Sequence, residues 1–241
     1  MHPEKGAFFM KDIAKAIILG VVLVLWLAFA IFVFTSQKIQ KTNKNIVKFM
    51  VRVAVFGGIS IILYTVPMLK FPVPFFPSFL EFHFDEIPIF IAGFAYGPWT
   101  AAAIILIKFL VKIPFTSTMV VGEISDLIYS TAFIIPAAII YQKHRKFSGA
   151  LIGILIGTVF QVVTAVVTNV YLMIPFYMFV MDFPEQAILA MCQAANANVT
   201  DVKWSYGLLC VLPFNVIKDA IVIIVTLLVY KATHKLIDKL A

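Results

Sequence analysis

The chain has 241 residues, of which 62% are apolar and 13% are charged, and its mean hydropathy is +1.02. Because a soluble globular domain is roughly 45–50% apolar, this composition excludes one and indicates an integral membrane protein. At about 20 residues per spanning helix, the length holds roughly six or seven spans and leaves no room for a separate soluble domain. The net charge of +7 is therefore interpreted through membrane topology, and no nucleic-acid partner is expected.

Apolar segments, taken in chain order, divide the sequence into two predicted parts. The first segment, residues 16–34, is followed by a short basic run that ends at Lys48. The next, residues 49–66, ends before a proline-rich stretch that cannot form a regular helix or a central strand. We therefore predict an additional N-terminal transmembrane helix with a basic cytoplasmic linker over residues 1–48, and a membrane domain over residues 49–241.

Two short apolar pieces and three long ones follow the proline-rich stretch. The short pieces, residues 85–97 and 99–111, are each too short to span comfortably as straight, isolated helices. Longer spans are expected at about residues 120–141, 149–175 and 208–230, and a polar stretch at residues 181–205 precedes the last.

Basic residues decide the predicted orientation, because short loops rich in Lys and Arg stay in the cytoplasm. Three basic clusters fall on one face if the spans alternate as predicted. The sequence therefore predicts a multi-pass protein of the cell membrane with a cytoplasmic C-terminus. The clusters are Lys38, Lys41, Lys44, Lys48 and Arg52; Lys143, Arg145 and Lys146; and Lys231, Lys235 and Lys239.

Polar groups at membrane depth are costly, and by default they mark a site or a salt bridge. Lys218 lies a few residues into the last span, three positions after Asn215, so both side chains share one helical face. Asn169 lies late in the preceding span. All three are candidate ligand contacts in the outer half of the bundle, although a helix-to-helix hydrogen bond would explain an isolated Asn169 equally well.

Acidic residues open two of the predicted helices. Asp85 and Glu86 open the first short piece, and Glu123 and Asp126 open a long span one turn apart. The helix dipole favours acids in a first turn, so a purely structural explanation competes with a role in a site. Lys108 lies within the second short piece, at a depth that the sequence leaves ambiguous.

The motifs that the sequence lacks narrow its function. It has no GxxxxGK[ST] phosphate-binding loop and no HExxH or GxSxG motif, and Cys192 and Cys210 form no metal-ligand cluster. The sequence therefore predicts neither an enzyme nor a self-powered pump, and no metal or cofactor. The leading hypothesis is a ligand-binding bundle that needs a separate motor. The alternatives are an autonomous carrier, and a membrane enzyme or assembly factor that uses Glu123, Asp126 and Asp85.

Two stripes of small residues could let another helix approach closely. Ala54 and Gly58 form one, and Gly149, Gly153 and Gly157 form the other. Packing within the chain is the alternative for both stripes, and it is favoured for the Gly149 stripe.

The order and spacing of six short motifs resemble the substrate-binding S components of energy-coupling factor (ECF) vitamin transporters, and among them the riboflavin-specific RibU group. The motifs are FHFDEIP, AYGP, IKFL, VGEISDL, TNVYLMIPFY and PFNVIKD, and the resemblance covers residues 53–237. It implies an all-α, six-helix S-component bundle with cytoplasmic ends, here preceded by the additional helix at residues 16–34.

The resemblance also implies a site and partners. In that family the Asn of the fifth helix and the Asn and Lys of PFNxxK contact the flavin ring, and these match Asn169, Asn215 and Lys218. Glu123 and Asp126 complete the predicted substrate-binding set. Riboflavin would be the transported ligand, and a transmembrane coupling protein and two cytoplasmic ATPases would be the partners. The coupling protein would dock on the Ala54 and Gly58 stripe.

The chain departs from the family pattern at several positions near the predicted pocket. DFSDIP is common where residues 83–88 read HFDEIP, Ala-Asn where Ser125 and Asp126 stand, and Gly where Asp219 stands. Because these changes alter charge or size, a modified flavin or another vitamin is the alternative ligand. Asp126 is also a candidate ion-pair partner of Lys218.

Overall fold

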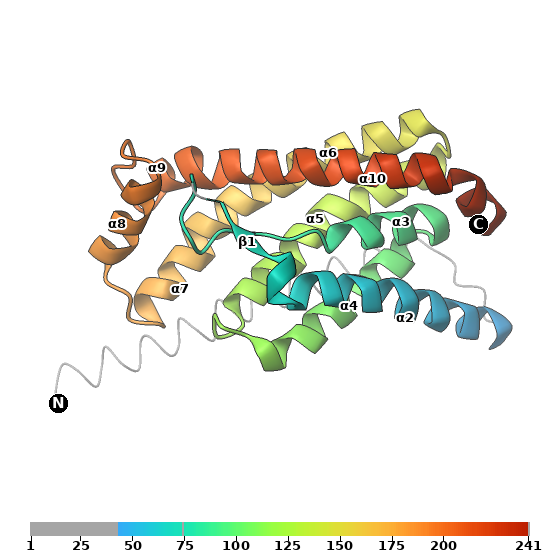
Figure 1. Cartoon of the computed structure of the whole chain (residues 1–241), viewed down its shortest axis with the longest axis horizontal. Helices are drawn as coiled ribbons and strands as arrows, with labels where there is room; N and C mark the ends of the chain where they lie inside the picture. The colour runs from blue at the N-terminus through green and yellow to red at the C-terminus, as the bar shows by residue number, and fades with distance from the viewer. Residues whose placement is uncertain (1–42, 74, 241) are drawn as a thin grey trace.

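The structure, a computed structural model, describes residues 43–73 and 75–240 (Figure 1). Within this part of the chain the protein is a bundle of helices, and its only strands are two of two residues each. The prediction of an all-α membrane protein is confirmed. The predicted N-terminal helix at residues 16–34, and the linker as far as residue 42, lie outside the described residues.

Five helical segments among the described residues are long and apolar enough to cross a membrane. A sixth apolar helix, α3 (Glu86–Tyr96), is shorter. The five segments are Ile46–Thr65, Pro98–Phe115, Val121–Lys143, Phe147–Phe179 and Trp204–Ala232.

Helix α2 (Asn43–Thr65) forms one side of the bundle and is the least buried of the five segments. It begins before residue 49, where the sequence predicted its start, because residues 43–48 contain no Pro or Gly and can continue the helix. Its outward side chains include Met50, Val51 and Val55, each more than half exposed. This face is therefore open to lipid or to another protein.

The proline-rich stretch after α2 folds into a small hairpin rather than a wholly irregular loop. A 3-10 turn, η1 (Pro67–Leu69), leads into strand β1 (Phe71–Pro72), which pairs antiparallel with β2 (Glu81–Phe82). Because proline lacks the N–H group that a ladder needs, the pairing ends after two residues.

Helices α3 and α4 (Pro98–Lys112) are joined at Gly97, whose φ of 94° is a conformation that favours glycine. Helix α3 is almost wholly buried, and Phe90 and Phe94 lie in the core. The second short piece extends further than the sequence predicted, and by length and composition it is able to span a membrane. Helix α4 starts at Pro98 and continues through the 3-10 turn η2 (Ile113–Phe115), which together give 18 residues.

Helices α5 (Val121–Lys143) and α6 (Phe147–Thr168) lie side by side along their length (Figure 1). The glycine stripe of α6 makes this contact possible. A Cβ atom on Gly157 would lie 2.1 Å from the carbonyl oxygen of Phe133, and one on Gly153 would lie 2.8 Å from that of Ala137. The Gly149 stripe therefore serves packing within the chain, which is the explanation that the sequence analysis favoured for it.

The last two long segments each contain a π-helical turn, and the sequence did not predict these. Helix α6 passes through η3 (Asn169–Met173) into α7 (Ile174–Phe179), and α9 (Trp204–Tyr206) passes through η4 (Gly207–Val211) into α10 (Leu212–Leu240). Between them, α8 (Glu185–Ala195) forms in the stretch predicted only as polar. π-Turns inside α-helices occur frequently at functional sites.

The three predicted basic clusters, as far as they are described, lie at one end of the bundle. The start of α2, the turn between α5 and α6 and the end of α10 all lie at this end, on the right of the view (Figure 1). The ring centroids of Phe147 and Tyr230 are 6.4 Å apart, so the start of α6 lies beside α10 at this end. The opposite half carries the hairpin.

Candidate functional site

A cavity of about 310 Å³ opens among α5, η3, α10 and the hairpin loop. Its volume lies at the lower end of the range for small-molecule pockets, roughly 300–1,000 Å³. Aromatic and apolar walls surround a small set of polar groups, which is the usual composition of such pockets. The apolar and aromatic part of the lining includes Tyr64, Phe79, Leu80, Tyr129, Met173 and Phe214.

All five side chains that the sequence predicted as ligand contacts line this cavity. Glu123 and Asp126 come from α5, Asn169 from the first residue of η3, and Asn215 and Lys218 from α10. Each is at most 6% exposed. The geometry therefore groups the same residues that the sequence grouped.

The cavity lies in the half of the molecule away from the basic end. Tyr64 lines it near the end of α2, a helix that starts at the basic end, and Asn215 lines it near the start of α10, which finishes there (Figure 1). The cavity and the described part of the basic clusters thus lie in opposite halves of the bundle.

Backbone carbonyl groups fix the orientation of both asparagines. The Nδ2 atom of Asn169 donates to the carbonyl oxygen of Ala165 at 2.9 Å, and that of Asn215 donates to the carbonyl oxygen of Val211 at 2.8 Å. Because a carbonyl oxygen can only accept, neither amide can be flipped. Gln161 Nε2 also donates to Asn215 Oδ1 at 2.8 Å, so Asn215 links α6 with α10 while it faces the cavity.

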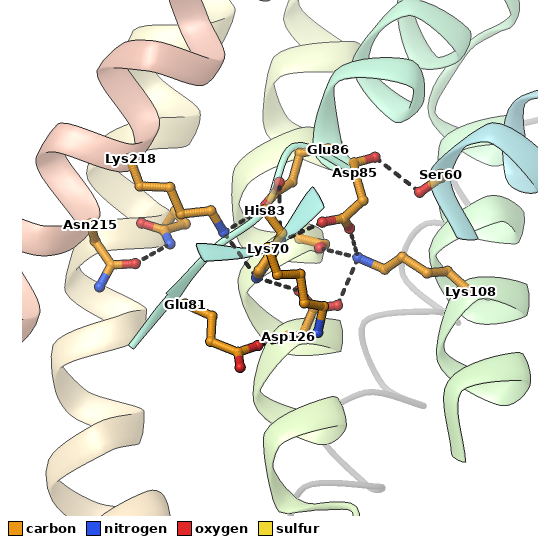
Figure 2. Close-up of polar contacts among 12 residues, drawn as sticks. Ser60, Lys70, Glu81, His83, Asp85, Glu86, Lys108, Asp126, Asn215 and Lys218 are labelled. Carbon is orange, nitrogen blue, oxygen red and sulfur yellow. Dashed lines mark hydrogen bonds and ion pairs between the residues drawn. The ribbon is translucent and has the colours of Figure 1, made fainter. Parts of the chain in front are cut away.

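Oppositely charged side chains form a buried network beside the cavity (Figure 2). Lys218 Nζ lies 2.6 Å from Glu86 Oε1. Lys108 Nζ lies 2.7 Å from Asp126 Oδ2 and is also bonded to Asp85. Since unpaired charges are expensive inside a membrane, each lysine allows at least one carboxylate to remain ionised there.

The ion pair that the sequence proposed between Asp126 and Lys218 is absent from the described contacts, and each partner pairs elsewhere. Asp126 on α5 faces Lys108 of the neighbouring α4, whereas Lys218 faces Glu86 in the first turn of α3. The hairpin loop places His83 between the two pairs. Its Nε2 atom is 3.5 Å from Lys218 Nζ and 4.0 Å from Asp126 Oδ1.

Sequence reasoning missed the roles of Lys108, His83 and Glu86. Asp85 and Glu86 are more than acids favoured by a helix dipole, because both are buried and ion-paired. The signal was present in the sequence as two lysines and several acids near membrane depth. The sequence did not show which lysine pairs with which acid.

Four of these groups have the residue types of metal ligands. Atoms of His83, Asp85, Glu86 and Asp126 lie within 4.8 Å of one another. The two lysine ammonium groups, however, already bond to the three carboxylates and balance most of their charge. The donor set therefore fits an ion-pair network better than a divalent cation.

His83 lies outside the membrane-spanning segments, in the loop before α3. Burial and the nearby Lys218 ammonium lower the pKa of His83, but the carboxylates of Asp85 and Glu86 outweigh both and raise it from 6.5 to about 9. The imidazole is therefore protonated at neutral pH, and its Nδ1–H group donates to Asp85.

Glu123 presents a carboxylate to the cavity without a lysine or arginine partner among the ion pairs of the described chain. Its Oε2 atom accepts hydrogen bonds from the hydroxyl groups of Thr116 at 2.7 Å and Thr118 at 3.1 Å. A carboxylate can accept about four hydrogen bonds, so Glu123 retains acceptor capacity for a ligand.

The predicted docking residues lie on the open face of α2. Ala54 is exposed, and a Cβ atom on Gly58 would meet no atom within 4 Å. Within the described chain this stripe is therefore not used for packing, in contrast to the Gly149 stripe.

Cys192 and Cys210 are both buried and not disulfide-bonded.

Comparison with known proteins gives the family. The sequence model described as "ECF transporter, substrate-specific component" matches residues 48–230. The chain belongs to this family, and it is accordingly a multi-pass membrane protein that serves as the substrate-binding component of an ECF-type importer and not as an enzyme.

Two curated relatives and one solved structure are similar to the chain. The riboflavin transporter RibU of Staphylococcus aureus (strain TCH60) is 25% identical over 192 residues, which cover 80% of this chain and 93% of that protein. The riboflavin transporter FmnP of Bacillus subtilis (strain 168) is 28% identical over 182 residues, covering 74% and 90%. The solved S component of a bacterial ECF transporter shares the fold, with a TM-score of 0.60, 23% identity and coverage of 78% and 96%.

Proposed function

We propose that this chain captures riboflavin or a closely related flavin at the outer face of the cell membrane. The observation that carries the proposal is the convergence of Asn169, Asn215 and Lys218 on one cavity from two segments distant in sequence. An isoalloxazine ring offers hydrogen-bond acceptors and an imide donor along one edge, which amides and a lysine can pair with. The names of the two curated relatives support the same ligand.

The uptake step itself would be the work of partners. A transmembrane coupling protein and two cytoplasmic ATPases would complete the transporter, since this chain carries no phosphate-binding loop. The open stripe of Ala54 and Gly58 is the proposed docking face for the coupling protein, because small residues let helices approach closely. The loaded bundle would then tilt in the membrane and carry its cavity toward the cytoplasm.

Titration of riboflavin with the purified protein tests the ligand, with quenching of flavin fluorescence as the measurement. We expect saturable binding, and a loss of affinity of about ten- to a hundredfold in Lys218→Ala and Asn169→Ala, because each change removes a buried hydrogen-bonding group. Lys203→Ala and Asn198→Ala change the same residue types at exposed positions, and they should bind as the unmodified protein does.

Lys218→Ala also leaves Glu86 without its lysine, so lost binding could reflect lost folding. The double variant Lys218→Met/Glu86→Gln removes the pair together, and its thermal unfolding separates the two causes. A folded double variant that binds riboflavin with full affinity would contradict the role of Lys218.

The charged network beside the cavity favours a test of other ligands in parallel. A thermal-shift screen of the unmodified protein against water-soluble vitamins identifies whichever ligand binds the folded state, since such a ligand raises the unfolding temperature. Unchanged riboflavin fluorescence together with a shift by another vitamin would replace the ligand but keep the transporter class. Uptake by vesicles that contain this chain alone would instead support an autonomous carrier.

A further inference from the structure

The hydrogen bonds of Asn169 leave its side chain able to act toward the cavity only as an acceptor. Its Nδ2 atom donates to the backbone carbonyl of Ala165 and to the hydroxyl oxygen of Tyr129, both at 2.9 Å. These two bonds use both amide protons. Its Oδ1 atom accepts from the Tyr206 hydroxyl at 2.9 Å, and a carbonyl oxygen has a second lone pair. That lone pair is what Asn169 can offer a ligand.

The Tyr129 hydroxyl is the complementary group beside it. Tyr129 on α5 lines the cavity and is only partly buried. Its oxygen accepts from Asn169, so its own proton is still to be donated. A side-chain hydrogen bond also joins Tyr129 to Ser125, one helical turn earlier. Because both residues line the cavity, a ligand there can take the Tyr129 proton in place of Ser125.

An acceptor next to a donor matches one feature of a flat, nitrogen-containing ring. An imide or lactam edge carries an N–H group directly beside a C=O group. The N–H group would donate to Asn169 Oδ1, and the C=O group would accept from the Tyr129 hydroxyl. If an amide proton of Asn169 were free, the side chain could either donate to a ligand or accept from it. The bond to Tyr129 uses that proton, so the site selects a ligand that presents an N–H group to Asn169.

We propose that Tyr129 is a specificity-determining residue, which donates a hydrogen bond to the ring carbonyl adjacent to the N–H group accepted by Asn169. The proposal rests on the proposed function, because a flavin is the imide-bearing ligand in question. It extends that function to a residue that the family motifs in this sequence did not indicate.

Tyr129→Phe tests the proposal, since it removes the hydroxyl and keeps the ring. Riboflavin affinity should fall about three- to tenfold, the usual worth of one hydrogen bond. In difference infrared spectra of the bound flavin, a ring carbonyl stretch should move to higher wavenumber, because the carbonyl loses a donor. Tyr171→Phe is the matched control. It removes the same atom from a tyrosine outside the cavity that is 60% exposed, and it should leave both measurements unchanged.

A second measurement needs no variant. Riboflavin methylated on the imide nitrogen has no N–H group for Asn169 to accept, so the unmodified protein should bind it at least about tenfold more weakly than riboflavin. If the unmodified protein binds riboflavin but binds the methylated compound equally well, the proposal is overturned while the proposed function stands. The same holds if folded Tyr129→Phe keeps full affinity and an unchanged carbonyl band. If the unmodified protein does not bind riboflavin at all, the proposed function fails and this proposal fails with it.

Discussion

Charged side chains near the cavity are tolerated in the bundle because they neutralise one another. Lys108 bridges Asp85 and Asp126, and its Nζ also donates a hydrogen bond to Ser130 Oγ at 3.1 Å. Lys218 pairs with Glu86. Removing one member of such a buried pair leaves an uncompensated charge, which is costlier than removing both members. The network therefore holds α3, α4, α5 and α10 in register around the cavity.

His83 makes the stability of this network depend on pH. Its pKa is raised from 6.5 to about 9, so the folded state holds a proton that the unfolded chain releases near pH 6.5. The stabilisation is fully present below about pH 6.5 and disappears as the pH rises through 9. We expect the unfolding temperature to fall between pH 6.5 and 9.5, by an amount equivalent to at most about 3 kcal/mol.

The variant His83→Gln supplies the comparison, because a glutamine does not titrate. Unfolding temperatures of both proteins, measured in one detergent across this pH range, should converge at high pH and separate at low pH. Parallel curves would mean that His83 does not titrate in the folded protein.

The residue types of this network were visible in the sequence, but their pairing was not. Asp126 and Lys218 were natural partners by predicted depth, yet α4 places Lys108 beside Asp126. Which lysine faces which acid depends on the rotation of each helix about its axis, and hydropathy does not report that rotation.

At the scale of elements, two similar stripes of small residues have opposite roles. Gly157 lies against the backbone of Phe133 on α5, whereas Gly58 faces open space on α2. The difference arises because α6 packs against α5 along its whole length, while α2 presents that face outward. The two glycines therefore form a matched pair for substitution.

Gly157→Ala should destabilise the bundle, because the new methyl group would overlap a carbonyl oxygen 2.1 Å from its ideal position. Overpacking of this kind costs about 1–3 kcal/mol. Gly58→Ala meets nothing within 4 Å and should change stability by less than about 0.5 kcal/mol. Thermal unfolding in detergent measures both, and equal unfolding temperatures for the two variants would contradict this account of α5–α6 packing.

The π-turns are the elements that sequence patterns failed to indicate. Asn169 is the first residue of η3, and Asn215 follows η4 by one helical turn. A π-turn inserts an extra residue into the helical repeat and so rotates the side chains that follow. The apolar pattern was enough to place both asparagines on the correct helices. It did not predict the π-turns, because an analysis of periodicity assumes a regular helical repeat.

At the scale of the whole molecule, the elements that carry the three basic clusters, as far as they are described, end on one side of the bundle (Figure 1), and the cavity lies in the other half. If short basic loops remain in the cytoplasm, the cavity faces outward, as capture of an external nutrient requires. The proposed orientation thus links the charge pattern of the chain to its proposed function.

A reporter at the C-terminus tests this orientation. Green fluorescent protein fused after the last residue should fluoresce in bacterial cells, because that reporter matures in the cytoplasm, and alkaline phosphatase fused at the same position should be inactive. An active phosphatase fusion would place the C-terminus outside and reverse the proposed direction of the cavity.

The sequence by itself determined the membrane class, the approximate spans, the basic end and the identity of the five candidate ligand contacts. These features follow from composition and from the local order of residues along the chain, and they do not depend on how the helices pack. Only the tertiary structure decided the ion-pair partners, the hydroxyl that Tyr129 turns toward Asn169, and which stripe of small residues stays open. Each of these depends on how helices rotate and approach one another, and that arrangement is fixed by side-chain packing between segments far apart in the chain.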